Sequence, residues 1–274
     1  MDELIFELKD IHYSYLGKFP ALAGVDLDVV KGSMVSVIGA NGTGKSTLLQ
    51  MLDALIHPQK GLVRAFGKDL NEGAFKDEEF SRFFRSKVGL VFQNPDVQLF
   101  CPTVKEDIVF GPLQLGVAQD EIKGRLDELA HTFDIKDLLE RSPHQLSVGE
   151  KRKVAIASTL AMDPEVLLLD EPTAGLDPAT VRHIIDIMLD AHEKGKTIIT
   201  ATHDLHILEE ISDVIHVFNR EKRIAKSGFA KDILADTELL EANNLVHIHK
   251  HRHKDKVHTH FHDHRLEHHH EEHS

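Results

Sequence analysis

Apolar residues along the chain form short continuous runs that alternate with longer stretches of helical pattern. The runs predict buried strands at Met34–Gly39, Val88–Gln93, Val166–Asp170, Thr197–Ala201 and Val214–Phe218. A helical pattern covers Lys45–Ile56, directly after the first of these strands. Because short buried strands that alternate with helices are typical of parallel sheets, we expect an α/β fold with a mostly parallel sheet.

The segments that precede and interrupt this series have patterns of their own. Three N-terminal runs predict an antiparallel β layer, at Leu4–Lys9, Ile11–Tyr15 and Val25–Val30. Residues 118–162 are helical in pattern and contain no strand candidate, which predicts a helical insert. Two helix starts are also predicted, by a capping box from Thr103 to Glu106 and by Asp177 followed by a proline.

The composition changes near Val246. Twelve of the 21 histidines lie in residues 247–274, where acidic and basic charges cancel, so the net charge of -13 belongs to residues 1–246. We therefore expect one domain over residues 1–246, with a helical subdomain at about 94–165. The histidine-rich tail of residues 247–274 is expected to be disordered without metal.

Charge and apolar content exclude several functional classes. A net charge of -13 without a basic stripe argues against nucleic acid as a partner. No apolar run reaches the length of about 18 residues that spans a bilayer, and the N-terminus lacks the pattern of a secretory signal. The single cysteine, Cys101, fits a reducing compartment.

A glycine-rich segment carries the most specific chemical signal. It matches the phosphate-loop pattern G-x-x-x-x-G-K-[ST] and consists of Gly39, Ala40, Asn41, Gly42, Thr43, Gly44, Lys45 and Ser46, with Thr47 after it. Backbone N–H groups of such a loop surround phosphate oxygens at a helix N-terminus. Lys45 suits the β- and γ-phosphates, and the Ser46 hydroxyl suits Mg²⁺. The motif alone does not separate kinases, GTPases and ATPases.

Two carboxylates follow the strand that begins at Val166. Asp170 at the strand end can hold Mg²⁺ through water. Glu171 points differently as the next residue, so it can polarise a water towards the γ-phosphate. After a phosphate loop, this pair predicts nucleotide hydrolysis.

The segment from Leu146 to Glu150 and the helix after it resemble the signature segment of ATP-binding cassette (ABC) proteins. In that family a serine and a glycine at this helix N-terminus face the γ-phosphate held by the other subunit. Ser147 and Gly149 match, whereas Val148 and Glu150 stand where glycine and glutamine are commonest. The resemblance implies a dimer, either a homodimer or a paralogous heterodimer.

Other positions match the family in order along the chain. Gln93 resembles the glutamine-loop residue, which contacts Mg²⁺ or the attacking water, and His203 resembles the switch histidine at the γ-phosphate. The Ala174–Asp177 segment resembles the loop that crosses the dimer seam. Tyr15 resembles the aromatic residue that stacks on adenine, with Tyr13 as the rival. The resemblance covers about residues 4–230 and implies a P-loop NTPase fold of the ABC type that hydrolyses ATP with Mg²⁺.

The segments Gln93–Phe100 and Glu106–Pro112 look like those of energy-coupling-factor ATPases. These proteins serve importers of vitamins or of cobalt and nickel. The resemblance implies a peripheral place at the cytoplasmic face of the cell membrane, with integral membrane transporter subunits as partners. Leu99 and Phe100 are expected to be exposed apolar residues, which would suit a helix-in-groove contact with such a partner.

The tail histidines favour a metal as the cargo. They occur in two alternating series, made of His247, His249, His251, His253, His258, His260, His262 and His264. Neutral imidazoles at this density bind nickel, cobalt, copper or zinc, so the tail is interpreted as a buffer or sensor for the imported ion. A purification tag and a solvated tail without a role are the alternatives.

The favoured interpretation is a translocase ATPase subunit that powers nickel or cobalt import. A vitamin or another cargo would keep the same ATPase role. A soluble nickel-delivery GTPase is the competing class, but Asn219–Lys222 does not match the guanine-reading pattern N-K-x-D. A soluble ABC protein of repair or translation would be expected to carry coiled-coil inserts or paired cassettes, and the sequence has neither.

Overall fold

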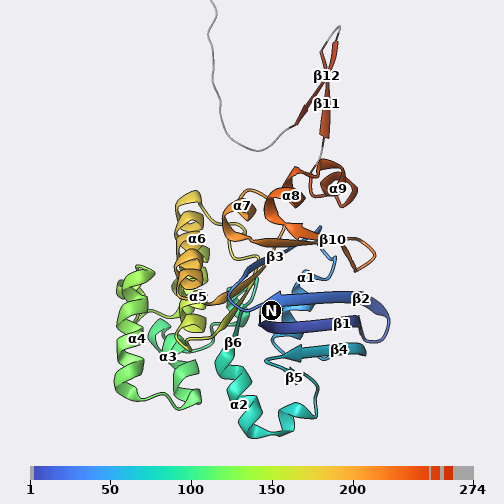
Figure 1. The fold of residues 1–274 in the computed structure, drawn as a ribbon. Helices are drawn as coiled ribbons and strands as arrows, with labels where there is room; N and C mark the ends of the chain where they lie inside the picture. Colours follow the sequence, from blue (N-terminus) through green and yellow to red (C-terminus); the bar gives the residue numbers. More distant parts are fainter. Residues whose placement is uncertain (1–2, 247, 254–255, 262–274) are drawn as a thin grey trace, which may run out of the picture.

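The structure is a computed structural model that describes residues 3–246, 248–253 and 256–261, with side chains described for residues 3–246. A six-stranded sheet forms its centre, in the order β10-β9-β3-β8-β7-β6 (Figure 1). These strands are β3 (Met34–Ile38), β6 (Val88–Val91), β7 (Val166–Asp170), β8 (Thr197–Thr202), β9 (Val214–Phe218) and β10 (Ile224–Phe229). Only β10 pairs antiparallel in this sheet. The expected α/β class with a mostly parallel sheet is confirmed.

A second, antiparallel sheet has the order β2-β1-β4-β5. Its strands are β1 (Leu4–Tyr15), β2 (Phe19–Val30), β4 (Lys60–Ala65) and β5 (Lys68–Asp69). The prediction of two separate strands before Tyr15 was wrong, because β1 is continuous. Its pairing with β2 shifts register between Leu8 and Ile11, and Asp10 has a φ of 50° there. This irregularity interrupts the alternation of apolar positions that the two-strand prediction used.

The helices lie on both sides of the six-stranded sheet (Figure 1). They are α1 (Lys45–Leu52), α2 (Glu78–Lys87), α3 (Val104–Leu115), α4 (Gln119–Thr132), α5 (Val148–Leu160), α6 (Pro178–Glu193), α7 (Leu208–Ile211), α8 (Ala230–Ala235) and α9 (Thr237–Ala242). Short 3-10 turns occur at Ala74–Lys76, Pro95–Val97, Lys136–Leu138 and Pro143–Gln145. Helices α3, α4 and α5 all lie between β6 and β7 in the chain, as the helical insert predicts.

Helix starts agree with the local sequence, whereas one helix end does not. Thr103 and Glu106 form the expected capping box at α3, and the Asp177 side chain accepts from two backbone N–H groups at α6. Helix α1 ends at Leu52 rather than at Ile56, since Ala54 takes a left-handed φ of 52°. Apolar residues after Leu52 prolong the helical pattern without prolonging the helix.

The two faces of the central sheet carry separate cores, as strand alternation requires. Val166 and Leu168 of β7 pack in one core with β1, β2 and α1. Leu167 and Leu169 pack in the other core with α3, α5 and α6. Both faces of the strand that ends at Asp170 are therefore buried, which fixes the position of that carboxylate.

Two further strands lie in the histidine-rich tail. β11 (Ile248–His253) and β12 (Lys256–Phe261) pair antiparallel, with His249 opposite His260 and His251 opposite His258. This differs from the expected disordered tail. The alternation of histidine with β-forming residues such as Ile248 and Val257 has the period of a strand. His247, His262 and His264 lie outside the described residues.

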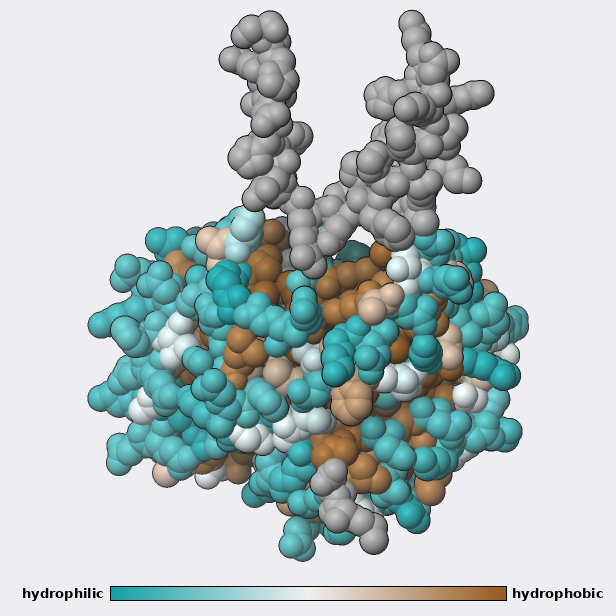
Figure 2. Space-filling model, turned by 45° about the horizontal axis from the view of Figure 1, so that its top comes forward, coloured by the Kyte–Doolittle hydropathy of each residue, from teal (hydrophilic) through white to brown (hydrophobic). Residues whose placement is uncertain are grey.

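The surface in Figure 2 is largely hydrophilic, with apolar areas between the charged side chains. Among the helices of the described residues, none has the length and apolar character that crossing a membrane requires.

Candidate nucleotide site

The phosphate loop connects the end of β3 to the start of α1. Gly44 precedes the helix with a φ of 113°, and a Cβ atom on it would lie 2.2 Å from the Ala21 carbonyl oxygen. Gly42 also has a positive φ, of 77°. Glycine is needed where backbone takes such angles and neighbouring backbone comes this close. The loop is therefore shaped by its contact with β2 as well as by its own residues.

Lys45 extends back over this loop from the first turn of α1. Its Nζ donates to the Gly39 carbonyl oxygen at 2.8 Å and lies 3.6 Å from Oε1 of Glu171. The side chain is buried, and burial lowers the pKa of Lys45 against the opposing effect of the Glu171 and Asp170 carboxylates. A buried cation held by one carbonyl and one carboxylate is suited to receive an anion.

Asp170 and Ser46 are the residues of the site whose side-chain oxygens could bind a divalent cation. Burial raises the pKa of Asp170, while a hydrogen bond from Ser46 and the cations Lys45 and Arg152 act in the opposite direction. Oδ1 of Asp170 is buried and has no hydrogen-bond partner within the described residues. A buried, unpartnered carboxylate oxygen beside a hydroxyl fits a hard divalent cation.

Glu171 is held from several sides. Its Oε1 lies 2.9 Å from Nδ1 of His203, and its Oε2 accepts from the Thr202 hydroxyl at 3.2 Å. Its backbone N–H donates to the Ala201 carbonyl oxygen, and its φ of 48° is in the left-handed region. A strained backbone held this firmly is characteristic of functional positions. The structure thus brings the three residues Lys45, Glu171 and His203 into one cluster.

Gln93 follows the strand β6, which pairs with the strand that ends at Asp170. The prediction that it ends a strand was wrong by two positions, because β6 stops at Val91 and Gln93 is in the connection after it. Its side chain is exposed, but its backbone carbonyl accepts from Arg152 at 2.6 Å. Since β6 pairs in parallel with β7, Gln93 and Asp170 leave the same edge of the sheet.

Tyr15 and Tyr13 occupy different environments. Tyr15 is the last residue of β1, and its hydroxyl lies 3.2 Å from both Thr47 Oγ1 and Gln50 Oε1 of helix α1. Tyr13 packs against the core and meets Tyr15 edge-on at a ring separation of 5.1 Å. Tyr15 is thus the tyrosine with an exposed ring beside the phosphate-loop helix.

The signature segment forms a capping box at the N-terminus of α5. The Ser147 hydroxyl accepts from the Glu150 N–H, and the Glu150 carboxylate accepts from the Ser147 N–H at 2.7 Å. The second bond lowers the pKa of Glu150. Val148 is 59% exposed. Within the described residues, no hydrogen bond joins Ser147 or Gly149 to the phosphate loop.

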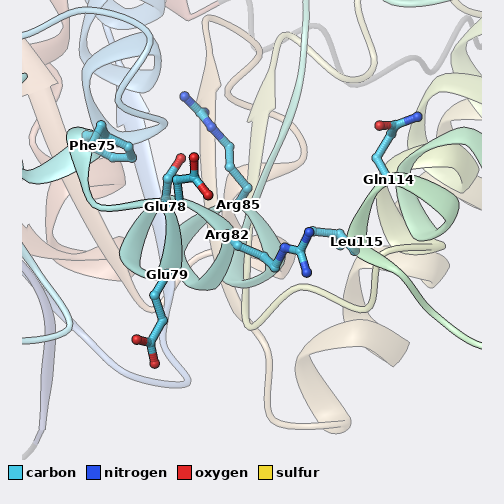
Figure 3. Close-up of a pocket in the computed structure, with 8 residues that line it drawn as sticks. Phe75, Glu78, Glu79, Arg82, Arg85, Gln114 and Leu115 are labelled. Carbon is cyan, nitrogen blue, oxygen red and sulfur yellow. The ribbon is translucent and has the colours of Figure 1, made fainter.

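A groove lies between α2 and the end of α3, away from these motifs. Figure 3 shows Phe75, Glu78, Glu79, Arg82 and Arg85 on one side and Gln114 and Leu115 on the other, with Arg82 extended towards Leu115. Phe100, which precedes α3, and Phe110 of α3 are both exposed, and their ring centroids lie 5.0 Å apart. Leu99, predicted to be exposed, is instead buried in the helical core.

Sequence reasoning did not assign a role to several residues that hold this site. Arg152 contacts the backbone at Gln93, Thr202 binds Glu171, and the Lys222 side chain donates to the Gly42 carbonyl oxygen. Their partners lie far away in the chain, so no local pattern identifies them. Outside the tail, the described side chains contain no group of three or more histidine, cysteine or acidic residues that could hold a metal ion.

Residues 22–174 match the ABC transporter family. The nickel import ATP-binding protein NikO of Rhodobacter capsulatus is 45% identical over 88% of this chain and 95% of that protein. The energy-coupling factor transporter ATP-binding protein EcfA of Methanocaldococcus jannaschii is 42% identical over 88% of this chain and 85% of that protein.

Two solved structures are also similar. CbiO1 from Clostridium perfringens, part of the ABC transporter complex CbiONQ, has a TM-score of 0.74 at 35% identity, over 89% of this chain and 96% of that one. An ATP-binding cassette solved as a dimer with ADP and Pi has a TM-score of 0.73 at 28% identity, over 82% of this chain and 98% of that one.

Proposed function

The chain belongs to the ABC transporter family of ATPases, and from this premise we propose that it powers import of nickel or cobalt. ATP hydrolysis coupled to transport, the use of Mg²⁺, and work as a dimer with membrane transporter subunits come with the family. The cargo, the role of each site residue and the domain division are the proposal. In it, residues 1–246 are the nucleotide-binding domain and residues 247–274 are a metal-binding tail.

The phosphate loop is proposed to bind the nucleotide. Its residues Gly39–Thr47 would surround the phosphates, with Lys45 as the cation that leaves Glu171 for the γ-phosphate. The 3.6 Å separation of these two side chains supports this exchange of partners. Tyr15 is proposed as the adenine platform because its exposed ring stands beside α1, whereas the Tyr13 ring belongs to the core.

Ser46, Asp170 and Gln93 are proposed to hold Mg²⁺ together with the phosphates. Bound there, the ion would neutralise charge that develops on the phosphate oxygens. These three side chains suffice because Mg²⁺ keeps waters and substrate oxygens as its other ligands. The unpartnered Asp170 oxygen supports the assignment.

Glu171 is proposed to orient the water that attacks the γ-phosphate, and to accept its proton. Thr202 and the Ala201 carbonyl hold the residue, so its carboxylate needs little reorganisation. His203, 53% exposed and bonded to Glu171 through Nδ1, would use its other ring nitrogen at the γ-phosphate. In this proposal the buried Glu171 is the base, and the half-exposed His203 is the hydrogen-bond donor to the γ-phosphate.

Ser147 and Gly149 are proposed to complete the site of a second subunit. Within the described residues, the Ser147 side chain takes part in the capping box of its own helix, and Ser147 and Val148 are exposed. A helix N-terminus that presents a hydroxyl to solvent suits an anion brought by another molecule. Two nucleotides would then be held between two chains, in a homodimer or a paralogous heterodimer.

The membrane partner is proposed to dock at the groove of α2 and α3. Helices α2 and α3 also carry the exposed apolar side chains Phe83, Phe110 and Leu113. Arg82 and Glu79 give the groove a charged wall. An amphipathic helix is the type of segment that such a groove accepts. This docking places the chain as a peripheral subunit on the cytoplasmic face of the membrane.

Nickel or cobalt is proposed as the cargo because of the tail histidines. The observation that carries it is the repeat of imidazoles over His247–His264, supported by the 45% identity to a nickel import ATPase. A vitamin remains the second candidate, since EcfA relatives are named without a cargo. The tail would bind the ion after entry.

The first experiment compares the full chain with a chain that ends at Val246. Isothermal titration with Ni²⁺, Co²⁺ and Zn²⁺ is run beside ATPase assays. A full-length variant with all twelve tail histidines changed to asparagine is the matched control for tail length. We expect metal binding only in the unaltered chain and similar ATPase rates in all three.

Uptake measurements then separate the cargoes. Cells that contain the complete transporter should take up labelled nickel or cobalt, and a Glu171→Gln subunit should abolish that uptake. Uptake of a vitamin with no uptake of either metal would overturn the proposed cargo while leaving the ATPase role intact.

A further inference from the structure

Arg152 is a buried cation in the second turn of helix α5. Only 2% of its surface is exposed, and burial lowers its pKa against the opposing effect of Asp170 and Glu171. Burying a guanidinium is unfavourable unless its hydrogen bonds are satisfied. The contacts of this side chain therefore indicate its role.

Both terminal nitrogens of Arg152 bind the connection that follows β6. Nη1 donates to the Phe92 carbonyl oxygen at 2.7 Å, and Nη2 donates to the Gln93 carbonyl oxygen at 2.6 Å. A planar guanidinium bound to two successive carbonyls fixes their direction as well as their distance. The backbone at Gln93 is thereby attached to α5.

Two neighbouring contacts strengthen this attachment. Lys151 binds Asp96 at 2.7 Å, and the Gln98 amide donates to the Ala155 carbonyl oxygen at 2.9 Å. Oε1 of the same Gln98 accepts from the Phe92 N–H. Residues 92–98 are thus bonded at several points to the helix whose N-terminus carries Ser147.

We propose that Arg152 is a positioning residue. It couples the position of the Gln93 side chain to the position of helix α5. The inference rests on the proposed role of Gln93. The Gln93 side chain is itself exposed, so its direction depends on the backbone that Arg152 holds. Movement of α5 towards a second subunit would carry the Gln93 backbone with it.

The test is a double-mutant cycle between Arg152→Gln and Gln93→Ala in the full chain, measured as Mg²⁺-ATPase activity. If Arg152 acts through the Gln93 side chain, its replacement should lower kcat about tenfold or more in the natural background. In the Gln93→Ala background it should lower kcat less than about twofold. Affinity of the single chain for ATP without Mg²⁺ should stay within about threefold, because the phosphate loop is unchanged.

Arg125→Gln is the matched control. Arg125 also donates to a backbone carbonyl, that of Ala161 at the end of α5, but lies outside the site. Hydrogen exchange without nucleotide should accelerate at residues 92–98 in Arg152→Gln and stay unchanged there in Arg125→Gln. If Arg152→Gln does not fold, Arg152→Lys replaces it, because lysine keeps the charge but cannot bind both carbonyls in the same geometry. It should show the same loss of kcat and the same faster exchange at residues 92–98, each to a smaller extent.

Three results distinguish the possible failures. Equal losses from Arg152→Gln in both backgrounds would overturn the inference, as would unchanged exchange at residues 92–98. A Gln93→Ala variant with full activity would instead remove the proposed role of Gln93. Loss of ATPase in Glu171→Gln checks the remaining site independently of both.

Discussion

The phosphate-loop side and the signature side of the chain satisfy their polar groups in different ways. On the first, Lys45 and His203 come from distant segments and both contact the buried Glu171 carboxylate. On the second, the side chains of Ser147 and Glu150 each accept from the other residue's backbone N–H, with Val148 exposed between them. The phosphate-loop side depends on contacts between distant segments, whereas the signature side depends on contacts between near neighbours and is exposed.

In the proposed mechanism, this difference would leave a single chain incomplete as an enzyme. The buried side would bind phosphate and hold the attacking water, which requires a fixed environment. The open side would meet a nucleotide that another subunit carries, so it would stay accessible until the subunits close. Substitutions on the two sides should therefore fail in different ways.

Glu171→Gln should have the largest effect. Removal of a general base costs about 10²- to 10⁴-fold in rate, and we expect kcat to fall about 10³-fold. ATP binding should be retained, because Lys45 and the loop backbone are unchanged. Single-turnover hydrolysis and equilibrium ATP binding are the measurements. A kcat within tenfold of the natural chain would assign the base to another residue.

Gly44→Ala should damage the same side through its backbone. The added Cβ would meet the Ala21 carbonyl at 2.2 Å, at a φ of 113°. We expect a loss of about 2–3 kcal/mol in unfolding free energy and weaker ATP binding. Gly116→Ala is the control, because Gly116 also has a positive φ but open space around it. Equal ATP affinities in the two variants would contradict the expected collapse of the loop.

Asp53→Asn should reveal a pH dependence of the helix that carries the phosphate loop. Asp53 caps the C-terminus of α1, and burial raises its pKa to about 7 against the effect of Arg85. A carboxyl with a raised folded-state pKa contributes stability below its unfolded pKa, and that stability is lost as pH rises through 7. Between pH 4 and pH 8, the free energy of unfolding of Asp53→Asn should therefore rise by about 1–3 kcal/mol relative to that of the natural chain.

Denaturant unfolding of both chains from pH 4 to 8 measures this difference. Parallel stability curves for the two chains would show that Asp53 ionises normally in the folded state.

Changes on the signature side should be smaller. Ser147→Ala is expected to lower kcat about tenfold and to leave ATP affinity of the single chain unchanged, since only the second subunit uses this hydroxyl. Loss of the cap should also cost about 1 kcal/mol of stability. Glu150→Gln is the matched variant, because glutamine can complete the same capping box, and its kcat should stay within about threefold. A large loss of ATP affinity in Ser147→Ala would contradict the separation of the two sides.

Local sequence determined much of this protein. The phosphate loop is one contiguous segment, so Gly39–Ser46 could be identified without a structure. The capping box at Thr103, the helix start at Asp177 and the buried strand that ends at Asp170 were predicted correctly for the same reason. Each depends on hydrogen bonds or alternation within a few residues.

Tertiary structure decided what depends on residues far apart in the chain. The continuity of β1 through Asp10 comes from its partner strands, and the raised pKa of Asp53 comes from the core that buries it. The bonds of Arg152 to the Gln93 backbone join segments 59 residues apart. The sequence by itself determined which groups could carry the chemistry, because short motifs encode local geometry. Only the fold decided which of them meet, because contacts between distant segments arise when the two cores assemble on opposite faces of one sheet.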